Sequence, residues 1–214
     1  MPRKSIVAAP SDDRTRQQIL NAAARLIREQ GYAVTTLRQI GQAAGIKAGS
    51  IYYHFASKED LLVEVLDTGM RMVADAVRER VDALPPGASS RDKVAAAIHG
   101  HLLGLLAHGD FTTANTRSYN QLPESIKTRH RGAQRDYAAY WESTLEQALE
   151  KGDLRKDVPI PMQRMFILGA LNWTVEWYSK SFGSVDRFAE HICKIVFEGI
   201  LVNDKQRRRA APGS

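Results

Sequence analysis

The chain has 214 residues, of which 43% are hydrophobic and 25% charged, and its formal net charge is +6. This length is enough for one or two domains with a sizeable core, and the composition is typical of a globular protein rather than a disordered one. No segment approaches the roughly 20 apolar residues of a membrane span, and the single cysteine, Cys193, excludes an internal disulfide. We therefore expect a cytoplasmic protein that makes no membrane contact and holds no metal or cofactor.

Positive charge is concentrated in the N-terminal part of the chain. Residues 1–60 carry nine Lys or Arg against five Asp or Glu, so that +4 of the net +6 lies there. We interpret residues 1–12 as a flexible basic arm rather than a secretory signal, because no sustained apolar stretch follows the charges. Such a charge distribution is typical of a nucleic-acid-binding protein, although a solvated basic surface gives the same count.

A short helix with clear start and stop signals is predicted after residue 35. Thr36 and Gln39 have the spacing of a capping box, in which each side chain satisfies a backbone N–H of the first turn. Leu37, Ile40 and Ala44 then follow at helical spacing. Gly45 supplies the backbone freedom that ends the helix in a sharp turn.

A second short helix and the start of a long third one follow this turn. Residues 48–55 have room for about two helical turns, and Ser57 with Asp60 forms the cap of the next helix. Two helices joined by a short glycine-containing turn are the helix-turn-helix pattern, whose second helix enters the major groove of DNA.

The second short helix carries side chains of two kinds. Ile51 and Phe55 are expected in the core. Tyr52 either contacts DNA or packs this helix onto its neighbours. The remaining polar side chains supply hydroxyl, imidazole and ammonium donors that suit phosphate contacts. These donors are Ser50, Tyr53, His54 and Lys58.

Residues 13–60 resemble the DNA-binding domain of the TetR family of transcriptional regulators. The matching stretches are Ile19-Leu20-Asn21-Ala22-Ala23, Gly31-Tyr32-Ala33-Val34-Thr35-Thr36, Ile51-Tyr52-Tyr53-His54-Phe55 and Lys58-Glu59-Asp60-Leu61-Leu62. The resemblance implies DNA contacts from Thr36, Arg38, Lys47, Ala48, Gly49, Ser50, Tyr52, Tyr53, His54 and Lys58. Because Ala48 and Gly49 have no polar side chain, Arg38 and Lys47 are the best candidates to recognise guanine through its O6 and N7 acceptors.

Beyond residue 60 the pattern predicts further helices without strand alternation. Including the long helix that starts at the cap, the expected helices span residues 57–84, 91–108, 111–121, 123–152, 162–180 and 185–203. The expected fold is all-α. It comprises an N-terminal three-helix helix-turn-helix domain (13–60), a C-terminal helical effector-binding and dimerisation domain (61–203), and a basic disordered tail (204–214).

The last two predicted helices have apolar residues on more than one face, so one face requires a cover other than the chain's own core. In TetR-like proteins the final two helices form a four-helix bundle across a two-fold axis. The resemblance therefore implies a homodimer that binds a palindromic double-stranded DNA operator.

A small-molecule effector site is expected in the second domain, because most TetR-like repressors bind one. The candidate residues combine tryptophans with nearby polar groups. They are Arg117, Asn120, Trp141, Asn172, Trp173 and Trp177. The alternative is that the tryptophans belong to the core and the dimer interface.

Residues 171–178 are similar to the corresponding segment of TetR-family regulators of lipid and steroid catabolism, which respond to acyl-CoA thioesters. The similarity implies an acyl-CoA effector, and other hydrophobic effectors remain the alternative. Four arginines of this domain either contact a CoA phosphate or are simply solvated. They are Arg117, Arg129, Arg131 and Arg135.

Catalysis has no support in the sequence. His99 and His101 are two residues apart on a predicted helix and point to different faces, and no metalloprotease, phosphate-loop or nucleophile-elbow motif occurs. We expect the histidines to be surface or capping residues. The predicted function is a homodimeric repressor released from its operator by a hydrophobic effector. The alternative is an effector-independent or partner-controlled DNA-binding protein.

Overall fold

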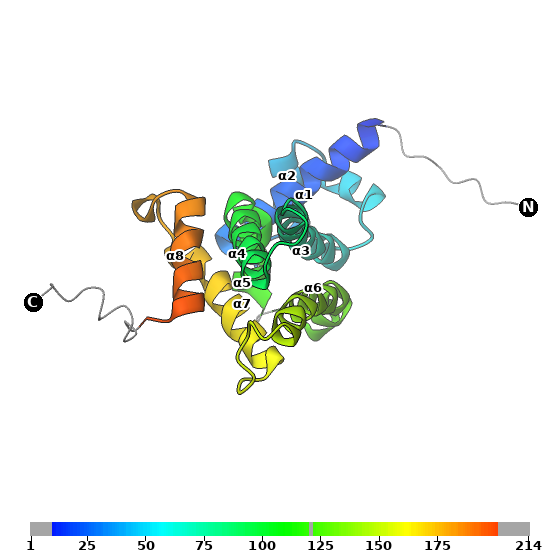
Figure 1. Cartoon of the computed structure of the whole chain (residues 1–214). Coiled ribbons are helices and arrows are strands. Elements are labelled where there is room, and N and C mark those ends of the chain that lie inside the picture. The colour runs from blue at the N-terminus through cyan, green and yellow to red at the C-terminus, as the bar shows by residue number, and fades with distance from the viewer. Residues whose placement is uncertain (1–9, 120–121, 201–214) are drawn as a thin grey trace, which may run out of the picture. The chain divides into compact units, whose positions relative to one another are not determined.

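The computed structural model describes residues 10–119 and 122–200, and within these ranges every regular element is a helix (Figure 1). The α-helices are α1 (Pro10–Gln30), α2 (Leu37–Ala44), α3 (Lys58–Asp82), α4 (Ser90–Ala107), α5 (Gly109–Ser118), α6 (Glu124–Glu150), α7 (Ile160–Trp177) and α8 (Val185–Glu198). Two 3-10 helices are η1 (Ala48–Tyr53) and η3 (Lys180–Phe182). The predicted all-α fold is confirmed.

The packing divides the chain into two compact units. Unit 1 comprises Met1–Asp75 and Gly104–Trp141, and unit 2 comprises Ala76–Leu103 and Glu142–Ser214. Helices α3, α4 and α6 therefore each contribute to both units. The helix-turn-helix segment shares its unit with α5 and the larger part of α6, a grouping that differs from the domain boundary expected at residue 60.

The core of unit 1 explains this grouping. Ile51 and Phe55 are buried as predicted, together with Ile19 of α1. The same cluster includes Phe111 of α5 and Ile126 of α6. Burying a large apolar side chain contributes about 1.5–3 kcal/mol, so α5 and α6 are a substantial part of what stabilises the helix-turn-helix segment.

Close helix packing in both units depends on glycine. A Cβ added at Gly69 of α3 would lie 2.7 Å from the carbonyl oxygen of Phe111 in α5. In unit 2, a Cβ at Gly100 of α4 would lie 2.6 Å from the Cα of Val77 in α3. These distances are below van der Waals contact with backbone atoms, so glycine is required where the helices cross.

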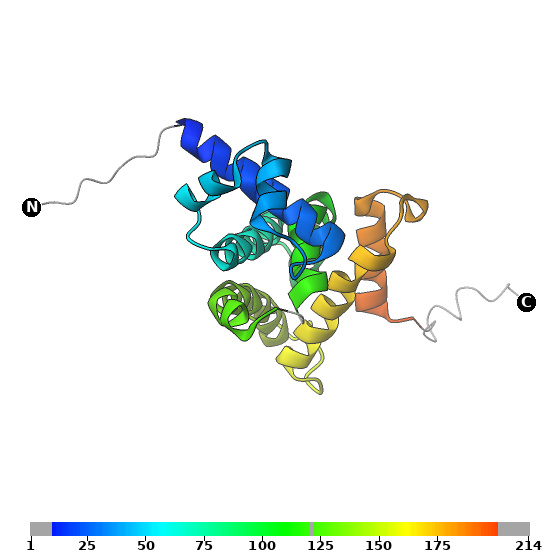
Figure 2. The same cartoon turned by 180° about the vertical axis from the view of Figure 1, so that it is seen from behind.

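In unit 2, α4 is linked to α7 by His101 and Asn172 and to α8 by Arg91 and Glu198. Helix α7 lies beside α8 (Figure 2). The buried side chains of this unit include Ile98 and Leu102 of α4, Leu171 of α7 and Phe188 of α8. The rings of Trp177 and Phe188 are 5.3 Å apart and nearly perpendicular, an arrangement that favours packing of α7 on α8.

Several boundaries differ from the sequence predictions. Residues 10–12, expected in the flexible arm, belong to α1, whereas the rest of that arm lies outside the described residues, as does the predicted tail. Residues 109 and 110, expected to lie between two helices, instead form the start of α5. The His108 carbonyl accepts the N–H groups of Phe111 and Thr112 there. Helix α8 ends at Glu198, before the predicted residue 203.

Two histidines are buried, contrary to the expectation that they lie at the surface or in caps. His101 is 2% exposed, and its Nε2 lies 3.2 Å from Oδ1 of Asn172. Burial lowers the pKa of His101 to about 4, partly offset by this hydrogen bond. His130 has no exposed surface and lies against Asp67. Both imidazoles are thus part of the packing between helices.

Candidate DNA-binding site and effector groove

The turn of the helix-turn-helix segment is built by local hydrogen bonds. Thr36 and Gln39 form the predicted capping box of α2, and Gly45 ends the helix at φ +72°. A Cβ at Gly41 would lie 3.1 Å from the backbone of Ala48, so α2 and η1 are in close contact. The element after the turn is a 3-10 helix that ends at Tyr53, shorter than the helix predicted to residue 55.

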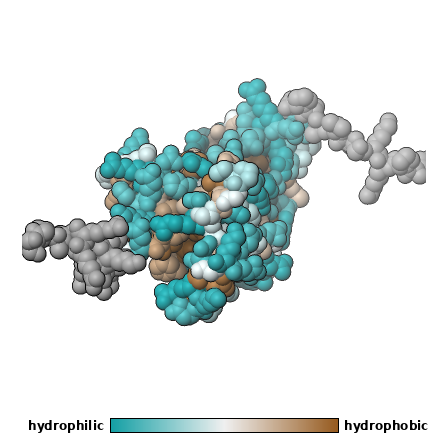
Figure 3. Space-filling view, in the orientation of Figure 1, coloured by the Kyte–Doolittle hydropathy of each residue, from teal (hydrophilic) through white to brown (hydrophobic). Residues whose placement is uncertain are grey.

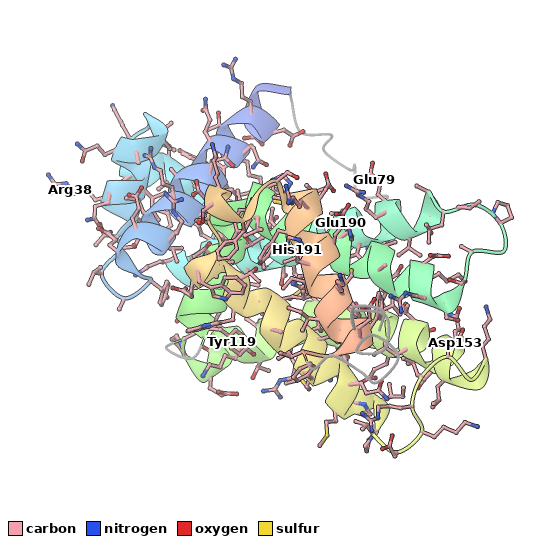
Figure 4. All side chains as sticks on the ribbon, turned by 60° about the vertical axis from the view of Figure 1, so that its left-hand side comes forward. Arg38, Glu79, Tyr119, Asp153, Glu190 and His191 are labelled. Atoms are coloured by element: carbon pink, nitrogen blue, oxygen red, sulfur yellow. The ribbon has the colours of Figure 1, made fainter. Side chains whose placement is uncertain are left out.

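The exposed polar side chains of this segment include two cations and two tyrosines among the predicted DNA contacts. Arg38 projects away from the ribbon (Figure 4), and Lys47 lies at the start of η1. Tyr52 and Tyr53 are 61% and 90% exposed. Tyrosine rings are normally at least half-buried in a folded protein, so two adjacent exposed rings beside cations form a surface suited to a phosphate backbone.

The small residues of η1 leave space at this surface. Gly49 is exposed, and no heavy atom lies within 4 Å of a Cβ added there. Ala48 and Ser50 are half-buried at the start of η1. The fold therefore does not itself require glycine at position 49.

The side chains of Thr36 and His54 have partners within the protein. The Thr36 hydroxyl accepts the Gln39 N–H and donates to Gln39 Oε1, so it serves the cap of α2. Nδ1 of His54 lies 3.2 Å from Oδ1 of Asp12 in α1, and its side chain is 9% exposed. His54, the residue that follows η1, is therefore in contact with α1, and its DNA contact stays a prediction.

Lys58 is also engaged internally. Its Nζ donates to the carbonyl oxygen of Tyr32 over 2.8 Å and lies 4.1 Å from the centre of the Tyr32 ring. Burial lowers the pKa of Lys58. The ammonium group thus ties the start of α3 to the loop between α1 and α2. A DNA contact by Lys58 stays a prediction, and it would have to share the ammonium group with this internal hydrogen bond.

The predicted effector residues that the structure describes differ in their exposure. Trp141 has no exposed surface and is a core residue of unit 1, in line with the alternative that this tryptophan belongs to the core. Trp173 and Trp177 are 64% and 42% exposed on α7. Asn172 is bonded to His101. The side chain of Arg117 and the whole of Asn120 lie outside the described residues.

Two of the four arginines considered as CoA phosphate contacts form ion pairs with carboxylates of the protein. Arg129 donates to Asp60 over 2.6 Å, and Arg131 donates to Glu124 over 3.1 Å. A third, Arg135, is exposed on α6. A phosphate at Arg129 or Arg131 would have to compete with an existing ion pair.

Unit 2 contains a groove of about 850 Å³ that sequence reasoning missed. Its walls come from α4, the end of α6, the connector before α7, α7 and the end of α8. Apolar side chains that line it are Val94, Leu145, Phe166, Ile167 and Val196. The volume falls within the range of about 300–1,000 Å³ that is usual for small-molecule sites. The five contributing segments are distant in sequence, so no local spacing could have indicated this groove.

Two arginines line the groove, and both have acidic partners. Arg91 lies 3.3 Å from Glu198 and 4.4 Å from the centre of the Phe197 ring. Arg155 donates two hydrogen bonds of 2.7 Å to Asp157. The groove thus combines an apolar wall with guanidinium groups that an anionic ligand could share.

The described residues contain no group of three or more His, Cys, Asp or Glu side chains arranged to hold a metal ion. None of the helices in residues 10–119 and 122–200 combines the length and hydropathy needed to cross a bilayer.

The exposed helix-turn-helix surface and the helical second part define a DNA-binding protein of the regulator class. Residues 19–65 match the family described as bacterial regulatory proteins, tetR family, and residues 87–200 match the tetracyclin repressor-like C-terminal domain. The chain belongs to the TetR family of transcriptional regulators. This agrees with the prediction that it is not an enzyme.

The HTH-type transcriptional repressor KstR2 of Rhodococcus jostii RHA1 is 28% identical over 199 residues, which cover 89% of this chain and 96% of that repressor. The structure of FadR from Bacillus subtilis with stearoyl-CoA superposes with a TM-score of 0.73 at 21% identity, covering 86% of this chain and 99% of FadR. AibR with isovaleryl coenzyme A and operator DNA gives a TM-score of 0.74 at 23% identity, covering 86% and 98%. At these identities the two structures establish the shared fold.

Proposed function

We propose that this TetR-type regulator is a cytoplasmic, homodimeric repressor that binds a palindromic operator and leaves it when an acyl-CoA binds. The observation that carries the DNA-binding part is the exposed set of Arg38, Lys47, Tyr52 and Tyr53 on the helix-turn-helix segment. The tyrosine hydroxyls are suited to phosphate contacts, and the two cations to base edges.

The exposed apolar side chains of unit 2 support the dimer. Figure 3 shows hydrophobic surface on the side of the molecule where Figure 1 has α7 and α8. Large apolar side chains are exposed on α7, on η3, on α8 and just after α8. They are Met162, Met165, Phe166, Trp173, Trp177, Phe182, Ile195 and Ile200. An apolar set of this size on a small protein marks an interface. A second copy that covers it would hold two helix-turn-helix segments at the spacing of successive major-groove faces, about 34–36 Å.

The effector class is supported by the similar proteins. FadR and AibR share this fold and were solved with stearoyl-CoA and isovaleryl coenzyme A. We assign the acyl-CoA to the groove of unit 2, where the apolar wall suits an acyl chain and Arg91 or Arg155 suits a phosphate. Each guanidinium would exchange part of its carboxylate contact for the phosphate, which has a similar geometry.

Repression and release then follow from differential binding. The free dimer binds the operator, and the acyl-CoA favours a state in which the two DNA-binding segments no longer match it. The effector can shift this equilibrium only by the difference between its affinities for the two states, and operator DNA must lower effector affinity by the same factor.

Selection of random double-stranded DNA by the purified protein is the first test. We expect a palindromic consensus bound by a dimer, with affinity that falls steeply with salt. Acyl-CoAs of increasing chain length are then added to the protein–operator complex, with free CoA and the free fatty acid as controls. Release by an acyl-CoA alone supports the effector class. Release by the fatty acid alone, or by none of the three, contradicts it.

The groove assignment has its own variants. Arg91→Gln and Arg155→Gln should weaken acyl-CoA binding while operator affinity stays unchanged. Arg131→Gln is a matched control, because that arginine is exposed on α6 and pairs with Glu124 of the same helix. If neither groove variant changes effector affinity, the acyl-CoA binds elsewhere.

A further inference from the structure

Two adjacent residues of α6 contact the first half of α3. Arg129 donates to Oδ1 of Asp60 over 2.6 Å, and Nδ1 of His130 lies 2.5 Å from Oδ1 of Asp67. Asp60 and Asp67 are seven residues apart, so two helical turns bring their carboxylates to the same side of α3. All four residues belong to unit 1, and α6 is thus fixed to α3 at two points.

Asp60 also belongs to the cap that follows η1. The Ser57 hydroxyl accepts the Asp60 N–H over 3.0 Å and donates to Asp60 Oδ2 over 2.8 Å. Hydrogen bonds from Ser57 and then Arg129 hold the pKa of Asp60 below its ordinary value, so this carboxyl group is ionised at neutral pH. One carboxylate therefore links α6 to Ser57, the residue that precedes α3 in the segment between η1 and α3.

The two contacts differ in depth. His130 is fully buried, and its ring centre lies 6.3 Å from that of Tyr119. Arg129 and Asp60 remain 46% and 31% exposed. Removing the imidazole would leave a cavity, whereas removing the guanidinium exchanges a solvent-accessible ion pair for water. A substitution of Arg129 therefore tests the positioning of the DNA-binding segment without a large loss of folding stability.

These contacts join the two parts of the chain that the family comparison distinguishes. Asp60 lies in the DNA-binding match, residues 19–65, and Arg129 lies in the C-terminal match, residues 87–200. Helix α6 has 27 residues, and its later residues Leu145 and Ala148 line the groove of unit 2. A single continuous helix thus carries both a groove wall and the residue that contacts the cap of α3.

We propose that Arg129 is a positioning residue for operator binding, which acts through Asp60 and Ser57 to orient η1 and which couples α6 to the DNA-binding surface. The first part concerns the unliganded protein. The second part, the coupling to an effector, rests on the proposed function.

The test compares Arg129→Gln with Arg131→Gln, which removes an equally exposed arginine from the same helix but breaks only its pair with Glu124. Arg129→Gln should lower operator affinity about tenfold and reduce the effector-induced change in affinity, with the thermal midpoint and effector affinity of the free protein unchanged. Arg131→Gln should behave as the unmodified protein. Asp60→Asn should reproduce the Arg129→Gln effect.

A double variant shows whether the two residues act through each other. If Arg129 acts through Asp60, the Asp60→Asn/Arg129→Gln protein binds the operator no more weakly than the weaker single variant. If the double variant instead loses operator affinity by the product of the two single-variant factors, Arg129 and Asp60 have independent roles and the proposal is overturned. An Arg129→Gln protein that matches the Arg131→Gln control in operator affinity would also overturn it.

Hydrogen exchange of the protein alone tests the positioning without DNA or effector. Amides in the first turns of α3, from Leu61 onward, should exchange faster in Arg129→Gln than in Arg131→Gln. An unmodified protein that selects no operator contradicts the proposed function but leaves this measurement decisive. Equal exchange in the two variants overturns the positioning role.

Discussion

The exposed surfaces of the two units differ in chemistry. In unit 1, the exposed large side chains of the helix-turn-helix segment include two tyrosines beside Arg38 and Lys47, whereas Lys58 and Arg129 are held by internal partners. In the described part of unit 2, the exposed large apolar side chains are those of Met, Phe, Trp and Ile. A polar aromatic surface can stay hydrated until it meets a polyanion, but an apolar surface gains free energy only when something covers it.

The largest predicted effect comes from charging the apolar face of unit 2. Phe166→Asp, at a side chain that is 70% exposed, should abolish the dimer with little loss of monomer stability. With a single DNA-binding segment per particle, operator affinity should fall on the order of 100-fold or more. Sedimentation and operator titration measure the two quantities. Gln147→Glu, on the exposed side of α6, is the control, and a Phe166→Asp protein that remains dimeric would contradict the interface.

Glycine substitutions distinguish a position that the fold requires from one that it leaves open. Gly100→Ala places a Cβ 2.6 Å from backbone atoms of α3 and should destabilise the protein by about 2–3 kcal/mol. Gly49→Ala meets no atom within 4 Å, so it should fold normally and alter DNA binding alone. Urea unfolding measures the first effect, and operator titration the second. Equal stability of the two variants would mean that α3 and α4 separate at low cost.

Acid should destabilise the protein through His101. Its pKa is about 4 in the folded protein, against an ordinary value of 6.5 for histidine, so between these values the unfolded chain binds the extra proton. The contribution of His101 is therefore fully present above about pH 6.5 and is lost as pH falls toward 4, by about 2 kcal/mol at pH 5. His101→Gln retains an amide donor for Asn172 without this titration. The difference in unfolding free energy between the two proteins should change across pH 7 to 5, and a constant difference would exclude the buried neutral imidazole.

The elements that sequence spacing predicted well are those whose determinants lie close together in the chain. Thr36, Gln39 and Gly45 lie within ten residues and determine the start and end of α2 through local hydrogen bonds. The internal partners of His54 and Lys58 could not be predicted, because Asp12 and the Tyr32 carbonyl are distant from them in sequence. A donor on an expected DNA-binding element looks the same in sequence whether or not another helix satisfies it.

The tryptophans show the same limit in the second half of the chain. Trp173 and Trp177 are four residues apart and therefore lie on one side of α7, but helical spacing does not say whether that side is covered. Trp141, the same residue type on another long helix, is fully buried. Burial depends on which helices cross, and a single sequence carries little information about that. The groove could not be predicted from the sequence for the same reason, because five separate segments form its walls.

The smallest predicted effects separate an exposed side chain from an internally bonded one within unit 1. Tyr53→Ala removes a side chain that is 90% exposed, so it should weaken operator binding by about 1 kcal/mol, roughly fivefold, with unchanged stability. Lys58→Ala removes the hydrogen bond to Tyr32 and should lower the unfolding free energy by about 1 kcal/mol. Urea unfolding and operator titration on both variants give the four values needed. Lys58 would instead be a direct phosphate contact if its replacement reduced the salt dependence of operator binding by one released ion and left stability unchanged, because only a contact with DNA changes that slope.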